Sequence, residues 1–211
     1  MLIDHFHNQN KTYKPYTEEL RSVLNLKNTR EAFDEIISWK GYEVTPLLSL
    51  EEIASKINVK KIYYKDESSR FGLGSFKALG GTYGVLKFLH DMLKKEIGSK
   101  VSLEDIRNGK YRKIVSKYTV ATATDGNHGR SVAFGANLFG CKCQIYIHSE
   151  VSKGRQEAME RLNANVIRVN GNYDESVNIC KSESNLNNWH IISDTSYPGY
   201  TKYPKDIMAG Y

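Results

Sequence analysis

Lys77 lies at the predicted start of a helix, where its local environment could make it a nucleophile. Lys77 falls in the first turn of a helix predicted over residues 75–97. That end of a helix carries partial positive charge, which together with partial burial favours the neutral, nucleophilic amine. Gly81 and Gly84 lie on the same side of the helix and would let a flat ring approach. A solvated surface lysine is the ordinary alternative, because most lysines are exposed.

A second candidate is the run Thr-Ala-Thr-Asp-Gly-Asn-His-Gly-Arg at residues 122–130, which joins a predicted strand to a predicted helix. Backbone N–H groups are free where Asn127 begins the helix, and the neighbouring Gly126 allows a ligand to approach closely. Helix N-capping is enough to explain Asp125 without catalysis. His128 could be a ligand or a base, although a hydrogen-bonded structural histidine is the commoner case.

A third candidate, Asp194, follows the last predicted strand at residues 190–193. It would lie at the same edge of the sheet as the other two, where it could serve catalysis or simply cap a turn. By contrast, the spacing of Gly72 and Gly74 matches neither common phosphate-loop pattern. These two glycines alone therefore indicate little.

Alternating strands and helices are predicted to position these residues. The predicted strands and helices lie at residues 61–65 (strand), 75–97 (helix), 114–122 (strand), 127–139 (helix), 144–148 (strand), 152–162 (helix), 166–169 (strand), 173–186 (helix) and 190–193 (strand). Such alternation is typical of right-handed βαβ crossovers and a largely parallel sheet, so the fold class is α/β. Ligands of open parallel sheets bind at the carboxyl ends of strands, which is where all three candidates fall.

The two ends of the chain differ from this pattern. Residues 1–29 are polar and weakly periodic, and they precede a predicted helix capped by Thr29, an extended segment and a short helix, at residues 29–39, 42–47 and 50–57. At the other end, a helix is predicted to begin with Pro204 and to turn Ile207 and Met208 inward. A domain rarely ends two turns into such a helix, so a truncated chain is expected.

Composition excludes several classes of protein. The 211 residues are 40% hydrophobic and 26% charged, which is ordinary for a globular protein. No apolar run is long enough to span a membrane and the start has no secretory pattern, so a cytoplasmic location without membrane contact is expected. The net charge of +6 comes from basic residues interspersed with acids, which argues against a nucleic-acid partner. Cys141, Cys143 and Cys180 lack zinc-site spacing, so reduced thiols and no metal are expected.

The chain resembles the pyridoxal-phosphate enzymes of the tryptophan synthase β-like fold, and among them the diaminopropionate ammonia-lyases. The likeness is carried by residues 42–47, 65–81, 122–129, 194–195, 199–200 and 207–211. Ser-Phe-Lys and Gly-Asn-His alone would also fit serine/threonine dehydratases and threonine synthases. The run Arg-Phe-Gly-Leu at residues 70–73 and the acidic Asp125 narrow the choice.

The resemblance implies a parallel-sheet three-layer sandwich of pyridoxal-phosphate fold type II, incomplete at the C-terminus. It implies that Lys77 carries the cofactor covalently and that Asn127 hydrogen-bonds its phenolic oxygen. Phe76 and the loop containing Gly126 would help to position the ring. The implied activity is α,β-elimination of 2,3-diaminopropionate to pyruvate and ammonia, a step of amino-acid catabolism, in a cytoplasmic homodimer.

The resemblance also implies roles for the three charged residues. Lys77 would act as a base on one face of the substrate and Asp125 on the other, so that both enantiomers react. Asp194 would be a second carboxylate near the substrate's β-ammonium. The runner-up activity is that of a serine/threonine dehydratase-like lyase, and the rival from another class is a non-catalytic α/β domain.

One departure from the family is large, because the chain contains no Gly-Gly-x-Gly phosphate loop and lacks the later partner of the pyridine nitrogen. The resemblance divides the chain into an N-terminal start of the larger cofactor-binding domain (1–74), a smaller α/β domain with the lysine helix and asparagine loop (75–195), and a truncated return into the larger domain (196–211). The chain is then either part of a longer ammonia-lyase or a shortened relative that binds the cofactor poorly or not at all.

Overall fold

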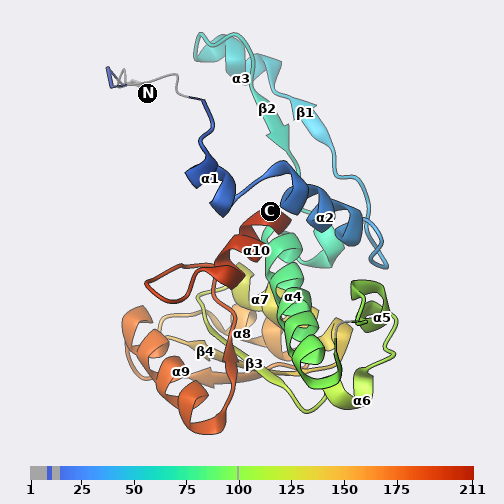
Figure 1. The fold of residues 1–211 in the computed structure, drawn as a ribbon. Helices are drawn as coiled ribbons and strands as arrows, with labels where there is room; N and C mark the ends of the chain where they lie inside the picture. Colours follow the sequence, from blue (N-terminus) through green and yellow to red (C-terminus); the bar gives the residue numbers. More distant parts are fainter. Residues whose placement is uncertain (1–8, 11–14, 99) are drawn as a thin grey trace.

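The computed structural model describes residues 9–10, 15–98 and 100–211, and its centre is a four-stranded parallel sheet (Figure 1). The strands are β3 (Thr119–Ala123), β4 (Lys142–Ile147), β5 (Asn165–Arg168) and β6 (His190–Ile191), in the spatial order β5-β4-β3-β6. The chain builds outward from β3 to β5 and then crosses back to place β6 on the other side of β3. The strand order therefore reverses at β3, and open parallel sheets bind ligands at such a point.

Helices cover both faces of this sheet and give the three layers expected of the fold. On one face α7 (Asn127–Phe139) packs against β3 and β4 beside α8 (Lys153–Glu160), with α4 (Lys77–Ile97) against α7, and α9 (Tyr173–Asn187) covers the other face. Side chains of β4 alternate between these layers, as strand geometry requires. Ile145 and Ile147 enter the larger core with α7, whereas Tyr146 packs with Cys180 of α9.

Packing around α4 depends on its glycines. The last helix, α10 (Lys202–Gly210), crosses α4 so closely that a Cβ atom on Gly80 would collide with the carbonyl oxygen of Ile207. A Cβ atom on Gly81 would collide with the Ser131 hydroxyl of α7, and one on Gly84 with the Ile207 side chain. The expectation that Gly81 and Gly84 leave room for a flat ring is therefore wrong, because neighbouring helices fill that space.

The N-terminal part forms an arm beside this body (Figure 1). In it β1 (Leu47–Ser49) and β2 (Tyr63–Lys65) pair antiparallel, joined through α3 (Glu51–Lys56). The strand predicted at residues 61–65 is thus present, but the expectation that it joins the parallel sheet is wrong. All three residues of β2 are exposed, whereas a strand inside a parallel sheet is buried on both faces.

The segment before β3 is helical where a strand was predicted. Two short helices, α5 (Leu103–Arg107) and α6 (Arg112–Val115), precede β3, which begins only at Thr119. The strand predicted at residues 114–122 is therefore right only in its second half. The apolar residues here are spaced three and four apart and pack against the core in the manner of a helix, namely Tyr111, Ile114, Val115 and Tyr118.

The other predicted elements are present within a few residues, with corrections at the two ends. The N-terminal helices are α1 (Glu18–Val23) and α2 (Leu26–Ile36), and α2 is capped by Asn25 rather than by Thr29. Pro204 is the third residue of α10, not the first. Ile207 is buried as expected, but Met208 is 46% exposed. Part of the predicted polar stretch 1–29 lies outside the described residues.

Within the described residues, none of the helices combines the length and the apolar character that crossing a membrane requires.

Candidate active site

A cavity of about 280 Å³ opens at the carboxyl ends of β3 and β6. Its wall brings together residues that are far apart in the sequence, namely Lys77, Ala123, Thr124, Asp125, His128, Tyr173, Asp194 and Thr195. Three of the predicted site residues, Lys77, Asp125 and Asp194, belong to this wall. A lysine amine and two carboxylates therefore share one small polar space.

Lys77 and Asp194 form the central ion pair of the cavity. Lys77 Nζ donates a hydrogen bond of 2.6 Å to Asp194 Oδ2. The two side chains are 35% and 22% exposed, so both still reach solvent. The structure thus has an ion pair with Lys77 as the cation, where the helix start suggested a neutral amine.

Two further groups approach the same oxygen of Asp194. His128 Nδ1 lies 3.6 Å from it, and the Tyr211 hydroxyl donates to it across 3.4 Å. Burial would raise the pKa of the Asp194 carboxyl, but the hydrogen bond and the charge of Lys77, together with the charge of His128 whenever its ring is protonated, outweigh burial and lower it. Asp194 therefore stays ionised at the centre of the cluster.

His128 is buried in the first turn of α7 with its ring orientation fixed. Its Nε2 lies 2.9 Å from the carbonyl oxygen of Ile192, so Nε2 carries the proton and donates it. Its Nδ1 has no hydrogen-bond partner among the residues that the structure describes. Burial lowers the pKa of the imidazole, although the Asp194 carboxylate opposes this effect. The neutral ring thus keeps an unprotonated Nδ1 near Asp194.

The loop that carries Asp125 is held by its neighbour Thr124. Thr124 Oγ1 accepts hydrogen bonds from the backbone N–H groups of Gly126 at 3.1 Å and Gly129 at 3.2 Å. The N-cap position of α7 belongs to Gly126, which has no side chain to cap with. The expectation that Asp125 caps this helix is therefore wrong. Its exposed side chain instead contributes to the cavity wall.

The other predicted cofactor residues lie outside the cavity wall. Asn127 begins α7 as predicted, but its side chain is exposed. Gly126 is buried and lies against the side chain of Arg155. Phe76 directly precedes α4, is 47% exposed, and meets the ring of Tyr211 edge-on at a centroid distance of 5.1 Å.

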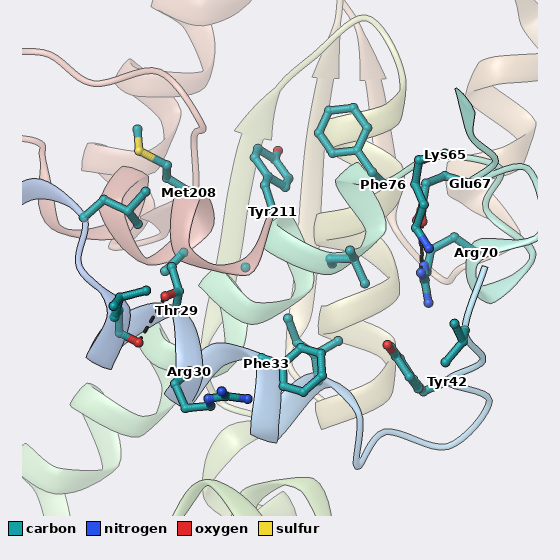
Figure 2. A pocket seen from close by; sticks show the side chains of 17 residues that line it. Thr29, Arg30, Phe33, Tyr42, Lys65, Glu67, Arg70, Phe76, Met208 and Tyr211 are labelled. Atoms are coloured by element: carbon teal, nitrogen blue, oxygen red, sulfur yellow. Dashed lines mark hydrogen bonds and ion pairs between the residues drawn. The ribbon is translucent and has the colours of Figure 1, made fainter. Parts of the chain in front are cut away.

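Phe76 and Tyr211 also line a larger groove of about 970 Å³, shown in Figure 2. The side chains around it are mainly apolar and come from α2, the N-terminal arm, α4 and α10. Figure 2 shows Phe33 and Tyr42 on one side of this space and Phe76 and Tyr211 on the other. Tyr211 therefore belongs to both regions, with its ring in the groove and its hydroxyl at Asp194.

Arg70 fixes the loop that leads to Lys77. It begins the short 3₁₀ helix η1 (Arg70–Gly72), and its buried guanidinium donates to Glu67 through Nε at 2.7 Å and Nη2 at 3.0 Å. It also donates to the Glu43 carbonyl at 2.6 Å and to the Thr45 hydroxyl at 3.1 Å. The hydrogen bond from Arg70 lowers the pKa of the Glu67 carboxyl. This network clamps the segment just before α4.

Sequence reasoning missed three residues of the site. Thr124 offers the clearest signal in hindsight, because Thr between a strand and a helix is a common capping residue. Tyr173 reaches the cavity wall from the start of α9, and Tyr211, just after α10, reaches Asp194 through its hydroxyl. Neither tyrosine has a local sequence signal, since tertiary packing alone brings it to Asp194.

The four-stranded parallel sheet with helices on both faces places the chain among the α/β proteins. Residues 39–211 match the family described as pyridoxal-phosphate dependent enzyme, and the chain belongs to that family. The predicted fold type is confirmed by the likeness to solved structures of that family.

The chain is similar to the diaminopropionate ammonia-lyase of Escherichia coli (strain K12), with 38% identity over 202 residues, 96% of the chain and 49% of that protein. A crystal structure of diaminopropionate ammonia lyase from Escherichia coli in complex with D-serine matches it with a TM-score of 0.80 and 36% identity, covering 89% of this chain and 47% of that one. A probable D-serine dehydratase of Rhizobium etli (strain CIAT 652) is 30% identical over 155 residues, 70% of the chain and 34% of that protein. The predicted resemblance to ammonia-lyases is confirmed, and the chain spans about half the length of the first of these relatives.

Proposed function

We propose that the protein acts as a pyridoxal-phosphate-dependent lyase that converts 2,3-diaminopropionate to pyruvate and ammonia by α,β-elimination. The observation that carries the proposal is the meeting of Lys77, Asp125 and Asp194 at one cavity where the strand order reverses. The identity of 38% to an ammonia-lyase of Escherichia coli supports this choice of substrate.

The residues of the cavity fit the reactive end of pyridoxal phosphate. The cofactor needs a lysine amine for covalent attachment, and Lys77 Nζ is available at the wall. The volume of about 280 Å³ is near the lower limit of the roughly 300–1,000 Å³ common for small-molecule sites, which suits a flat ring. Asn127, Gly126 and Phe76 lie outside the cavity wall, so we propose that they contact the cofactor where it extends beyond this cavity. The sequence has no Gly-Gly-x-Gly, so we assign the phosphate to no residue of this chain.

Each charged residue has a separate task in the proposed reaction. The bound cofactor supplies an electron sink for the carbanion that forms when Cα loses its proton. Lys77 takes that proton on one face of the substrate, and Asp125 takes it on the other. Asp194, which its neighbours keep ionised, binds the β-ammonium of the substrate.

The groove supports the proposed division into domains. Its walls come from residues 1–74 and 196–211, apart from Phe76 and Leu79 of the proposed smaller domain. The two segments assigned to the larger domain thus meet in space, although the smaller domain separates them in sequence. The proposed enzyme is a homodimer.

A spectroscopic titration and a substrate panel test the proposal. Pyridoxal phosphate added to the protein should give the visible absorbance of the lysine-bound cofactor, and Lys77→Ala should abolish it. A band that survives this substitution would exclude Lys77. Both enantiomers of diaminopropionate should yield pyruvate faster than either enantiomer of serine. Turnover of serine alone would identify a dehydratase-like lyase, and neither band nor turnover would identify a non-catalytic domain.

A further inference from the structure

The ion pair between Lys77 and Asp194 creates a need for a proton acceptor. An ammonium group cannot attack a carbonyl carbon, so Lys77 must lose a proton before it can bind a carbonyl cofactor. Its hydrogen bond runs to Asp194 Oδ2 at 2.6 Å, and the same oxygen lies 3.6 Å from His128 Nδ1. That nitrogen is buried and has no hydrogen-bond partner in the described part of the chain. It is a vacant proton site one step beyond the carboxylate.

We propose that His128 holds the proton that Lys77 releases. An N–H bond of Lys77 breaks, the proton passes through Asp194 Oδ2, and an N–H bond forms at His128 Nδ1. Lys77 becomes a neutral amine, His128 becomes an imidazolium, and Asp194 remains a carboxylate. The summed charge of the three groups is unchanged, and the half-buried Asp194 carboxylate always has one cation beside it. The inference rests on the proposed function, because the cofactor is what requires a neutral Lys77.

The groups around His128 make its protonation depend on the charge of Lys77. Burial and the Lys77 ammonium lower the pKa of His128, whereas the Asp194 carboxylate and the Ile192 carbonyl raise it. While Lys77 is charged, the ring therefore stays neutral. When Lys77 loses its charge, its repulsion of the imidazolium disappears and the attraction of Asp194 remains.

The other titratable groups at the cavity do not compete for the proton. Asp125 at the wall carries a negative charge that would stabilise an imidazolium rather than oppose it. Burial raises the pKa of the Tyr173 hydroxyl and of the Tyr211 hydroxyl, and nearby Asp194 raises both further. Both tyrosines thus remain neutral donors, so His128 Nδ1 is left as the acceptor.

Nitrogen-15 NMR of histidine-labelled protein tests the proposal without any cofactor. In the native protein His128 should titrate at low pH and keep its proton on Nε2. In Lys77→Met, Asp194 has lost its cation, so the titration midpoint of His128 should rise by about one pH unit or more, a tenfold gain in proton affinity. Adding Asp194→Asn to that variant should abolish the rise. Lys77→Gln repeats the measurement with a second neutral side chain if the first variant folds poorly.

His90 provides a matched control inside the same molecule. Its Nε2 also lies near a backbone carbonyl, that of Val101 at 3.1 Å, and its Nδ1 also lacks a partner among the described residues. It lies on α4 but outside the cavity wall, so its midpoint should not move in any of these variants. An unmoved His128, or an equal shift of both histidines, would overturn the proposal.

The same variants separate this inference from the proposed function. If only the inference fails, the cofactor absorbance still depends on Lys77, but the titration midpoint of His128 is the same in Lys77→Met as in the native protein. If only the proposed function fails, His128 still responds to Lys77→Met, and no absorbance forms. A third readout is the rate of cofactor attachment, whose pH profile should move to higher pH in His128→Asn, since Lys77 must then deprotonate to solvent.

Discussion

The cavity at Lys77 and the groove beside it both involve Tyr211, yet their side chains differ. Those at the centre of the cavity are polar and paired, and those of the groove are mainly apolar and exposed. In the cavity, a cation and an anion pair at 2.6 Å inside about 280 Å³. In the groove, apolar side chains are open to solvent across about 970 Å³, with Leu26 87% and Val44 82% exposed. In the cavity, Lys77 and Asp194 neutralise each other, whereas none of the residues that the structure describes covers the apolar groove.

This difference suits the cavity to a chemical reaction and the groove to contacts with other protein surfaces. Large exposed apolar patches usually mark surfaces for further contacts. The cavity, in contrast, is positioned by β3, β6, α4 and α7, which form one packed core. We therefore expect substitutions in the cavity to act on reaction and charge, and substitutions in the groove to act on association.

The largest expected effect is on the reaction at the cavity. Asp125→Asn should lower turnover of one enantiomer of diaminopropionate about 10²- to 10⁴-fold, the usual range for loss of an acid–base group, and the other less than tenfold. Pyruvate formation from each enantiomer measures this. Asp34→Asn, on the exposed surface of α2, is the control and should change neither rate. Equal losses for both enantiomers in Asp125→Asn would contradict the two-base scheme.

The next effect falls on the packing that joins the two regions. Gly80→Ala places a Cβ atom against the carbonyl of Ile207 and should cost about 1–3 kcal/mol by overpacking. Gly154→Ala, in α8 with open space around it, should instead be neutral or stabilise by up to about 1 kcal/mol. Urea denaturation compares the free energies of unfolding. A tolerated Gly80→Ala would show that α10 does not pack on α4 as described.

Stability should also fall as the pH is lowered, through one buried and two half-buried histidines. Burial lowers the folded-state pKa of His90, His128 and His190 below the unfolded value of about 6.5. Between the two values only the unfolded state binds the protons, so this stability is complete above about pH 7 and is lost as pH drops. Urea unfolding between pH 8 and pH 5 measures the slope. A stability that stays constant or increases toward pH 5 would contradict the described burial.

The smallest effect is expected in the groove. Phe33 is 49% exposed, so Phe33→Ser should change the free energy of unfolding by no more than about 1 kcal/mol. Phe88→Ala, at a core position that is 1% exposed, should cost about 3–5 kcal/mol. Denaturation of both variants gives the contrast. A large loss in Phe33→Ser would mean that the groove wall is part of the folded core.

Much of the parallel-sheet region could be predicted from the sequence, because its elements have strong local signals. The helix predicted at residues 127–139 has those bounds in the structure, since polar Asn127 and Gly140 flank a continuous apolar pattern. The strand predicted at 61–65 was assigned to the wrong sheet, because the residue pattern of a strand does not indicate which other strand it pairs with. Tyr111 to Tyr118 misled the prediction because a short apolar run fits strand and helix alike.

For the candidate site, the sequence indicated which residues belong to it, but it did not indicate which of them contact one another. Asp125 and Asp194 follow neighbouring strands of the parallel sheet, and the packing of α4 on α7 brings Lys77 to the same cavity. The proximity of Asp194 to Lys77 spans 117 positions, which no local pattern encodes. The same holds for Tyr211, and for the glycines of α4, whose purpose becomes clear only with α7 and α10 in place.

Reductive trapping of the cofactor tests the central claim most directly. The protein is incubated with pyridoxal phosphate, treated with borohydride to make the attachment permanent, digested, and analysed by mass spectrometry. We expect the label on Lys77 ahead of every other lysine, and we expect Asp194→Asn to change its extent. A label spread over exposed lysines such as Lys153, with Lys77 unmodified, would contradict the assignment of this cavity as the cofactor site.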